Sequence, residues 1–219
     1  MLRKAALALG SLTVAEAGYR SGEVKTIETF KYGKFKARIR APYKLGTVTS
    51  FFTFWDGPHR TVQGWNEIDV EIVPSIIENP FSTNIISKNA AQDQAYAKGF
   101  KPGTDWHVYA IEWTPDYISW FVDGVQQRRV EHKANVDFLN KEQNLFMNFW
   151  TPTTGVWSKG FSAHDFPWYA KYDWVETYTW NGHDFDFHWR DDFNNFDASR
   201  WRKSDGWGYE WDHCLFYAS

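Results

Sequence analysis

Within the stretch of residues 65–73, acidic and apolar side chains alternate strictly from Glu67 to Ile72, which leaves little choice of local structure. The acidic positions are Glu67, Asp69 and Glu71, and the apolar positions between them are Ile68, Val70 and Ile72. Because successive side chains of a β-strand point to opposite faces, this stretch predicts a strand with one apolar face and one acidic face.

The acidic face also bears on function. Three like charges on one strand face repel one another and resist burial. A sequence that served stability alone would avoid them, so a function is a reason to keep them. Two carboxylates that flank a scissile bond are the groups that hydrolyse glycosidic bonds. The alternative interpretation is a half-exposed strand whose polar face happens to be acidic, and this stretch by itself leaves both open.

Composition narrows the possible ligands. The chain has 219 residues, enough for one domain with a sizeable core, and 20% of them are aromatic, including 14 Trp. Aromatic faces suit stacking on sugar rings. The formal net charge of −3 disfavours nucleic acid and strongly anionic polysaccharides as partners. The single cysteine, Cys214, excludes an internal disulfide and a cysteine-based zinc site, and no apolar run is long enough for a transmembrane helix.

The rest of the chain predicts an all-β fold. Alternating or apolar runs that indicate strands occupy residues 24–29, 34–39, 48–55, 81–87, 106–114, 117–122, 145–150 and 169–179. Asp123-Gly124, between two alternating runs, is a strong hairpin signal. No segment has sustained helical periodicity. Many short strands indicate a β-sandwich or barrel, and we expect a jelly-roll sandwich of two antiparallel sheets with a concave cleft.

Two segments keep alternative interpretations. Residues 1–17 have the layout of a short secretory signal, with Arg3-Lys4 before an apolar run, but the same run fits a strand of the domain. In residues 183–188, period two would place Asp184, Asp186 and His188 on one face, as in a metal site. An edge strand is the favoured interpretation of this second segment.

Residues 67–71, Glu-Ile-Asp-Val-Glu, resemble the active-site signature of glycoside hydrolase family 16, whose members are jelly-roll β-glucanases with retaining chemistry. Further stretches that resemble this family are residues 32–35, 46–52, 106–109, 113–115, 120–124, 148–150 and 172–175. Together they extend over nearly the whole chain, so the resemblance implies a single family 16 domain over residues 1–219.

Two features indicate which members of family 16 the chain resembles most. Laminarinases of the family carry one more residue between the Asp and the second Glu, whereas the short form here is typical of licheninases and of xyloglucan transglycosylases. Residues 193–207 resemble the start of an ordinary licheninase, yet they lie near the end of this chain. The chain therefore resembles a circularly permuted licheninase, an arrangement that a jelly roll tolerates because its termini lie close together.

By resemblance, Glu67 is the nucleophile and Glu71 the general acid/base. Their Cα atoms would lie roughly 13 Å apart along a strand. Retaining chemistry needs carboxyl groups about 5–5.5 Å apart, which two long Glu side chains on a curved strand can reach. Asp69 would hydrogen-bond the nucleophile and, through its charge, help to keep Glu71 protonated. The residues alone do not order the pair.

The resemblance also implies a set of sugar-binding residues. They are Glu23, Phe52, Phe54, Trp65, Asn84, Trp150, Trp157, Lys203 and Trp207. Ser82 stands where relatives carry a longer Gln, and Phe54 stands where a relative has Tyr. Each Trp could instead pack in the core, because Trp is so abundant here. The tryptophans assigned to the core are Trp113, Trp120 and Trp174.

The remaining expectations concern metal, localisation and activity. Asp173 matches a carboxylate that helps to bind a structural calcium in the family, and Cys214 is expected to pack as a small hydrophobe. We expect a secreted, monomeric enzyme that needs no cofactor for chemistry and cleaves neutral mixed-linkage β-glucan. The alternatives are a family 16 enzyme active on xyloglucan or β-1,3-glucan, and a non-catalytic carbohydrate-binding jelly roll.

Overall fold

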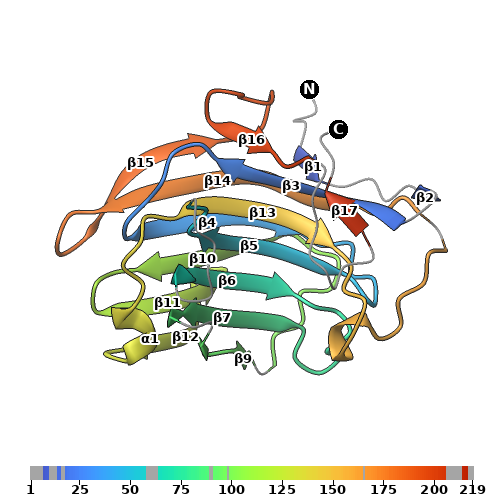
Figure 1. The fold of residues 1–219 in the computed structure, drawn as a ribbon, viewed down its shortest axis with the longest axis horizontal. Coiled ribbons are helices and arrows are strands. Elements are labelled where there is room, and N and C mark those ends of the chain that lie inside the picture. The colour runs from blue at the N-terminus through green and yellow to red at the C-terminus, as the bar shows by residue number, and fades with distance from the viewer. Residues whose placement is uncertain are drawn as a thin grey trace.

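The computed structural model describes residues 7–9, 14–15, 18–57, 64–88, 91–97, 99–164, 166–205 and 214–216. These residues form a sandwich of two β-sheets (Figure 1). The back sheet runs in the order β1 (Leu7–Leu9), β14 (Ala170–Trp180), β4 (Gly33–Arg40), β10 (His107–Trp113), β11 (Tyr117–Val122) and β12 (Val125–Glu131), and β15 (Phe185–Asp191) also pairs with β14.

The front sheet is the larger one. It runs in the order β16 (Trp201–Lys203), β3 (Gly18–Thr26), β13 (Asn144–Trp150), β5 (Val48–Phe54), β6 (Glu67–Ile72), β7 (Phe81–Ser87) and β8 (Ala91–Gln92), with β9 (Ala95–Tyr96) on β7 and with β2 (Val14–Ala15) and β17 (Cys214–Phe216) on β3. The named pairs in both sheets are antiparallel except β17 with β3, which is parallel. The short helix α1 (Ala134–Asp137) and the 3-10 turn η3 (Val156–Ser158) lie in connections.

The predicted all-β sandwich is confirmed, and several predicted strands match closely. β7 and β11 have the predicted bounds, and the other expected strands differ by a residue or two at most ends. The Asp123-Gly124 hairpin joins β11 to β12, and both residues have positive φ (48° and 80°), as a two-residue turn of this kind requires. β3 extends to Gly18, well before the predicted start at residue 24, because β2 and β17 pair with its polar first half.

The core lies between the two sheets. Trp113 and Trp120 are fully buried there, as predicted. Trp174, also assigned to the core, is only half-buried and stacks under the guanidinium of Arg190, 4.5 Å from the ring centroid. The register between β14 and β4 shifts between Tyr172 and Trp174, so a β-bulge turns Trp174 to the outer face. The assignment of Trp174 to the core was therefore wrong.

Residues 183–188 form the turn and the start of β15, an edge strand that pairs with β14, as the favoured interpretation predicted. Asp186 accepts a hydrogen bond from Asn181, and His188 contacts Glu28 at 2.9 Å. Among the described residues, no group of three or more His, Cys, Asp or Glu side chains is arranged to hold a metal ion. In the same part of the chain, no helix has the length and apolarity needed to cross a bilayer.

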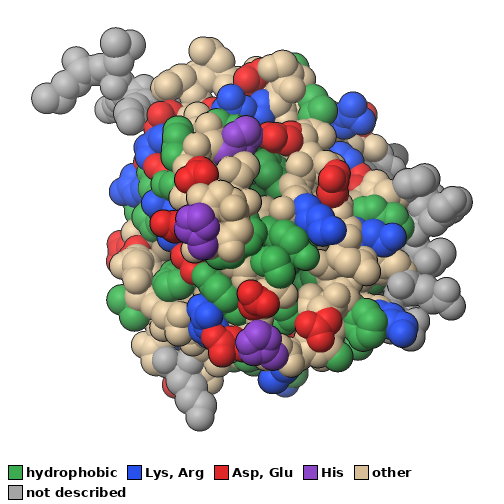
Figure 2. All heavy atoms as spheres, turned by 90° about the vertical axis from the view of Figure 1, so that its left-hand side faces the viewer, with side chains coloured by type: hydrophobic (Ala, Val, Ile, Leu, Met, Phe, Trp, Pro, Cys, Tyr) green, Lys and Arg blue, Asp and Glu red, His purple; other side chains and the backbone are tan. Residues whose placement is uncertain are grey.

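Acidic and basic side chains are interspersed on the face of the sandwich that Figure 2 shows, without one sign dominating it. This mixture agrees with the small net charge of −3. A phosphate-rich or strongly anionic polymer would need a concentrated positive field. The face in Figure 2 offers no such field.

Candidate active site

The acidic strand becomes β6, an inner strand of the front sheet between β5 and β7. Its apolar residues Ile68, Val70 and Ile72 are 0%, 0% and 1% exposed, because they point into the core. The three carboxylates therefore project from the opposite face, away from the back sheet. Opposite them in register are Phe54, Phe52 and Ser50 on β5, and Ile86, Asn84 and Ser82 on β7.

Two core side chains, Trp120 and Tyr172, hold this part of the front sheet in place by hydrogen bonds. The indole N–H of Trp120 on β11 donates to the backbone oxygen of Asp69 at 2.9 Å. The hydroxyl of Tyr172 on β14 donates to the backbone oxygens of Ser50 and Asn148 at 2.7 and 3.1 Å. Buried polar groups rigidify a core when they are satisfied in this way. These hydrogen bonds from the back sheet thus fix the position of β6 and of its neighbours in the front sheet.

The carboxylates have strongly altered proton affinities. Burial is the largest cause at each of them. It raises the pKa of Glu67 to about 7, although hydrogen bonds from Trp65 (Nε1 to Oε2, 2.5 Å) and Asp69 oppose it. Burial and the charge of Glu67 raise the pKa of Glu71 to about 8, against a hydrogen bond from Ser82. At neutral pH, Glu71 is therefore the carboxyl that keeps its proton, and Glu67 is the one that ionises first.

Asp69 differs from its expected role in one respect. Burial and the charges of Glu67 and Glu71 raise its pKa well above the usual value, so the neutral form is favoured. A neutral carboxyl can donate a hydrogen bond, and Asp69 shares one with Glu67 that lowers the pKa of Glu67. The predicted hydrogen bond to Glu67 is thus present. The charge that raises the pKa of Glu71 is that of Glu67 and not, as expected, that of Asp69.

Aromatic rings form one wall beside Glu67. The ring of Phe52 stacks on Phe146 with centroids 5.0 Å apart, and Phe54 meets Phe146 and Trp65 edge-on at 6.0 and 5.8 Å. Phe146 was not among the predicted residues. Phe146 lies two residues before Asn148 in β13 and therefore on the same strand face. The strand predicted over residues 145–150 could thus have placed Phe146 beside the site.

The buried polar residues beside the carboxylates are Glu23 and Asn84. Glu23 is 2% exposed and accepts hydrogen bonds from Asn148 at 3.1 Å and Ser204 at 2.6 Å. Asn84 lies opposite Asp69, and its side-chain oxygen has no hydrogen-bond partner among the described residues. The same holds for the side-chain oxygens of Ser50 and Asn148. Unpaired buried acceptors cost free energy, and such a cost is typical of a site that binds a polar ligand.

The other predicted sugar-binding residues are three tryptophans and Lys203, and they lie in different surroundings. Trp157, in η3, is half-buried and donates to the hydroxyl of Tyr96 at 2.9 Å. Trp150 is 8% exposed and belongs to the buried apolar cluster, but it lies two residues after Asn148 in β13 and so on the same strand face as Phe146 and Asn148, and its sugar-binding role stays a prediction. Trp207 lies outside the described residues. Lys203 is exposed on β16, with its ammonium 5.0 Å from the centre of the Phe196 ring.

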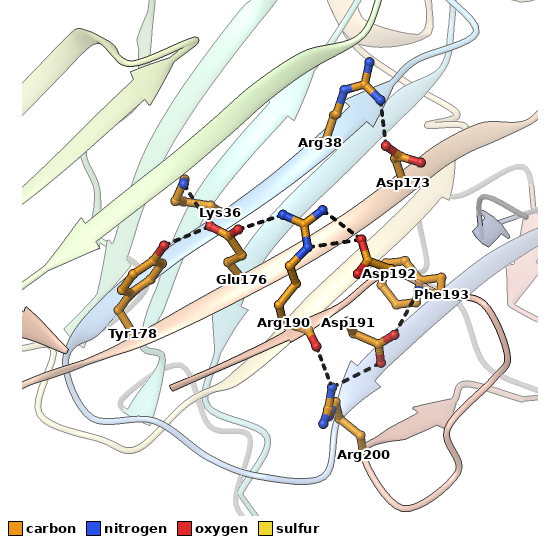
Figure 3. A network of polar contacts seen from close by, with 10 residues as sticks. All are labelled: Lys36, Arg38, Asp173, Glu176, Tyr178, Arg190, Asp191, Asp192, Phe193 and Arg200. Atoms are coloured by element: carbon orange, nitrogen blue, oxygen red, sulfur yellow. Dashed lines mark hydrogen bonds and ion pairs between the residues drawn. The ribbon is translucent and has the colours of Figure 1, made fainter. Parts of the chain in front are cut away.

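Asp173, the predicted calcium ligand, lies on the outer face of the back sheet. One of its carboxylate oxygens is 2.6 Å from a guanidinium nitrogen of Arg38 (Figure 3). A guanidinium in this position opposes a second cation, so the described residues around Asp173 do not favour calcium. The side chain of Cys214 is not described, so its predicted packing stays a prediction.

Comparison with known proteins identifies the family. The profile of "Glycosyl hydrolases family 16" matches residues 3–176. The chain belongs to glycosyl hydrolases family 16. It is 33% identical over 219 residues to a beta-glucanase of Fibrobacter succinogenes, a match that covers 94% of this chain and 61% of the relative. A beta-glucanase of Brevibacillus brevis is 32% identical over 179 residues, or 77% of this chain and 64% of the relative. This family 16 chain therefore spans less than two thirds of the length of these two relatives.

Solved structures of the family have the same fold. The beta-glucanase of Bacillus licheniformis superposes with a TM-score of 0.66 at 25% identity, covering 80% of this chain and 78% of that one. A beta-1,3-1,4-glucanase (lichenase) from a mouse hindgut metagenome gives a TM-score of 0.60 at 25% identity, covering 77% and 83%. These similarities confirm the predicted family and jelly-roll fold.

Proposed function

We propose that this family 16 chain is an endo-acting, licheninase-type glucanase that hydrolyses mixed-linkage β-1,3-1,4-glucan with retention of configuration. The observation that carries the proposal is that Glu67, Asp69 and Glu71 lie side by side on the outward face of the inner strand β6, where burial raises the pKa of each. Glu71, whose pKa is raised to about 8, and Glu67, whose pKa is raised to about 7, lie two strand positions on either side of Asp69, whose pKa is also raised. Two titratable groups whose pKa values are pushed apart are the mark of an acid and a nucleophile.

In the proposed mechanism, Glu71 gives its proton to the glycosidic oxygen while Glu67 attacks the anomeric carbon. The leaving sugar departs with that proton, and a glycosyl ester on Glu67 remains. Glu71, now ionised, then takes a proton from water, which attacks the ester and releases the second product. Asp69 and Trp65 donate hydrogen bonds to Glu67 and favour its ionised form before attack.

The surroundings support a neutral polysaccharide as substrate. Phe52, Phe54, Trp65 and Trp157 offer rings, and the unpaired oxygen of Asn84 offers an acceptor for a sugar hydroxyl. The proposed preference for β-1,4 bonds next to β-1,3 linkages is supported by the short spacing of the Glu67-Asp69-Glu71 signature and by the similarity to a solved beta-1,3-1,4-glucanase.

Parallel digestion of barley β-glucan, laminarin and xyloglucan tests the proposal. We expect oligosaccharides from barley glucan and little product from the other two. Rapid cleavage of laminarin or xyloglucan would reassign the substrate within the family. Binding to barley glucan without any product would instead identify a carbohydrate-binding jelly roll.

We further propose that the chain is circularly permuted. Residues 193–207 lie beyond the family match at residues 3–176, yet Trp201 in this segment is 2% exposed and β16 pairs with β3. The described part of the segment, residues 193–205, therefore belongs to the sandwich. Joining it ahead of residue 18 in an unpermuted variant should give a folded, active enzyme, and loss of folding would contradict the permutation.

Secretion, a monomeric state and a structural calcium are proposed on the resemblance alone. Size-exclusion chromatography with light scattering tests the monomer. Thermal unfolding with calcium and with a chelator tests the metal. Because Arg38 occupies the surroundings of Asp173, a calcium-dependent rise in Tm that disappears in Asp173→Asn would be needed to support calcium there.

A further inference from the structure

A chain of hydrogen bonds runs from Trp157 to Glu71 through the edge of the front sheet. The indole N–H of Trp157 donates to the Tyr96 hydroxyl at 2.9 Å, and that hydroxyl donates to the side-chain oxygen of Gln94 at 3.4 Å. The amide nitrogen of Gln94 donates to the Ser82 hydroxyl at 3.3 Å. Ser82 in turn donates to Oε2 of Glu71 at 3.4 Å.

The direction of this chain is determined by its first member. An indole N–H can only donate, so the Tyr96 hydroxyl accepts from Trp157 and its own proton is left for Gln94. Gln94 accepts with its oxygen and therefore presents its N–H to Ser82. The Ser82 hydroxyl, which accepts from Gln94, gives its proton to Glu71. Every proton along the chain thus points toward the carboxylate.

The strand pairing places these residues together. Ser82 on β7 pairs with Glu71 on one side and with Tyr96 of β9 on the other. Gln94 lies in the connection between β8 and β9, close enough to bond the short Ser82 side chain.

We propose that Gln94 and Tyr96 are positioning residues that link the sugar platform of Trp157 to the acid/base Glu71. This inference rests on the proposed function, in which Glu71 is the proton donor and Trp157 stacks on sugar. A sugar seated on Trp157 holds the indole, and the chain then holds the Ser82 hydroxyl on Glu71. Gln94 and Tyr96 touch neither the scissile bond nor the reacting atoms, and they act through Ser82.

The chain has a definite electrostatic effect. A donor aimed at a carboxylate stabilises the ionised form, so Ser82 lowers the pKa of Glu71 against burial and the charge of Glu67. The other titratable groups that face Glu71 are Asp69 on β6 and Tyr96 on β9. Burial raises the pKa of Tyr96, against the hydrogen bond from Trp157, so Tyr96 keeps its proton for Gln94.

The test compares Tyr96→Phe, Gln94→Leu and Ser82→Ala with the wild type. Each substitution removes a different member of the hydrogen-bond chain. Because the chain favours ionised Glu71, its loss should raise the pKa of Glu71 and move the alkaline limb of the kcat/KM profile to higher pH. The shift should be about half a pH unit for Ser82→Ala and smaller for the other two. The matched controls are Gln92→Leu, on the same sheet edge in β8, and Tyr169→Phe, an exposed tyrosine before β14.

A merely structural role for Gln94 and Tyr96 would lower activity or Tm and leave the limb unmoved, and that result would overturn the proposal. Trp157→Phe keeps a ring for sugar but removes the N–H. It should shift the limb in the same direction as Tyr96→Phe, and the double variant should add nothing further. Additive shifts would mean that Trp157 and Tyr96 act separately.

A second readout separates this proposal from the proposed function. The carboxyl resonances of 13C-labelled glutamate report the pKa of Glu71 directly, with Glu71→Gln identifying the signal. If no glucan is cleaved, the glucanase assignment fails, but a higher Glu71 pKa in Tyr96→Phe and Gln94→Leu still supports the chain. An unchanged Glu71 pKa in both variants would refute the proposed role of the hydrogen-bond chain, even if the enzyme cleaves glucan.

Discussion

Strands β4 and β6 are built on the same pattern with opposite charge. β4 alternates four basic residues with apolar ones, as β6 alternates three acidic residues with apolar ones. On the back sheet, Lys34 and Lys36 lie directly opposite Glu112 and Glu176, and each pair is an ion pair at 2.8 Å. On the front sheet, the residues opposite the carboxylates are neutral.

The pKa values follow this difference in neighbours. Although burial acts in the other direction, hydrogen bonds from Lys36, Arg190 and Tyr178 lower the pKa of Glu176 (Figure 3). Without such cations, burial raises the pKa values of Glu67 and Glu71. Alternation alone therefore gives a strand with a charged face. The cross-strand partners decide whether that face serves stability or chemistry.

The largest contrast should come from removing one carboxylate from each strand. Glu67→Gln should reduce hydrolysis of barley glucan by roughly 10³-fold or more, because the nucleophile is lost. Glu176→Gln, the same substitution in the ion-pair network, should leave the rate within about a factor of two. Initial rates of reducing-sugar release provide the measurement. Residual activity above about a tenth in Glu67→Gln would remove Glu67 from the nucleophile role.

The pH dependence of activity should reflect the raised values on β6. Glu67 must be ionised and Glu71 protonated, so kcat/KM should rise toward a pKa of about 7 and fall above about 8. The expected profile is a narrow bell with its maximum between these limits. In Glu71→Gln the alkaline limb should disappear. An alkaline limb that persists in that variant would assign it to another group.

Stability should show the cost of burying carboxylates whose cross-strand neighbours are all neutral. The folded-state pKa of Glu71 is raised from 4.5 to about 8, so the folded protein binds this proton more tightly than the unfolded chain. Its contribution to stability is full below pH 4.5 and is lost as the pH rises through about 8. Glu71→Gln should therefore raise Tm at pH 8.5 by a few degrees and change it little at pH 4.5. A lower Tm at pH 8.5 would contradict this account.

The smallest effect should appear on the back sheet, with the opposite sign. The lowered pKa of Glu176 means that its contribution is present above the unfolded value of 4.5 and is lost as the pH falls through the folded value. Glu176→Gln should destabilise the protein at pH 7 by at most about 1 kcal/mol, because the pairs are partly exposed. Urea unfolding at pH 7 and at pH 3 measures this, and the difference between variant and wild type should shrink at pH 3.

The strands and the orientation of most of their side chains could be predicted from the sequence, because period-two alternation is a local property. The bounds of β7 and β11 and the face of Glu67, Asp69 and Glu71 all follow from it. The position of Trp174 could not, because a single bulge reverses the alternation and leaves no mark in the residues around it.

The roles inside the site depend on cross-strand neighbours, which alternation does not reveal. The raised pKa values of Glu67, Asp69 and Glu71 come from burial and from charges brought together by the fold. Tyr96 lies in the two-residue strand β9 and Gln94 directly precedes it, and so short a strand has no alternation pattern. Their contact with Ser82 exists only through the pairing of β7 with β9.

The central claim is that Glu67 forms a covalent bond to the sugar while Glu71 does not. A mixed-linkage oligosaccharide with fluorine at C2 of the reacting sugar and a good leaving group slows breakdown of the intermediate, so the adduct accumulates. Peptide mass spectrometry then locates it. This account predicts one adduct, on the side chain of Glu67, that disappears in Glu67→Gln. An adduct on Glu71, or hydrolysis of natural glucan with inverted products and no adduct, would contradict it.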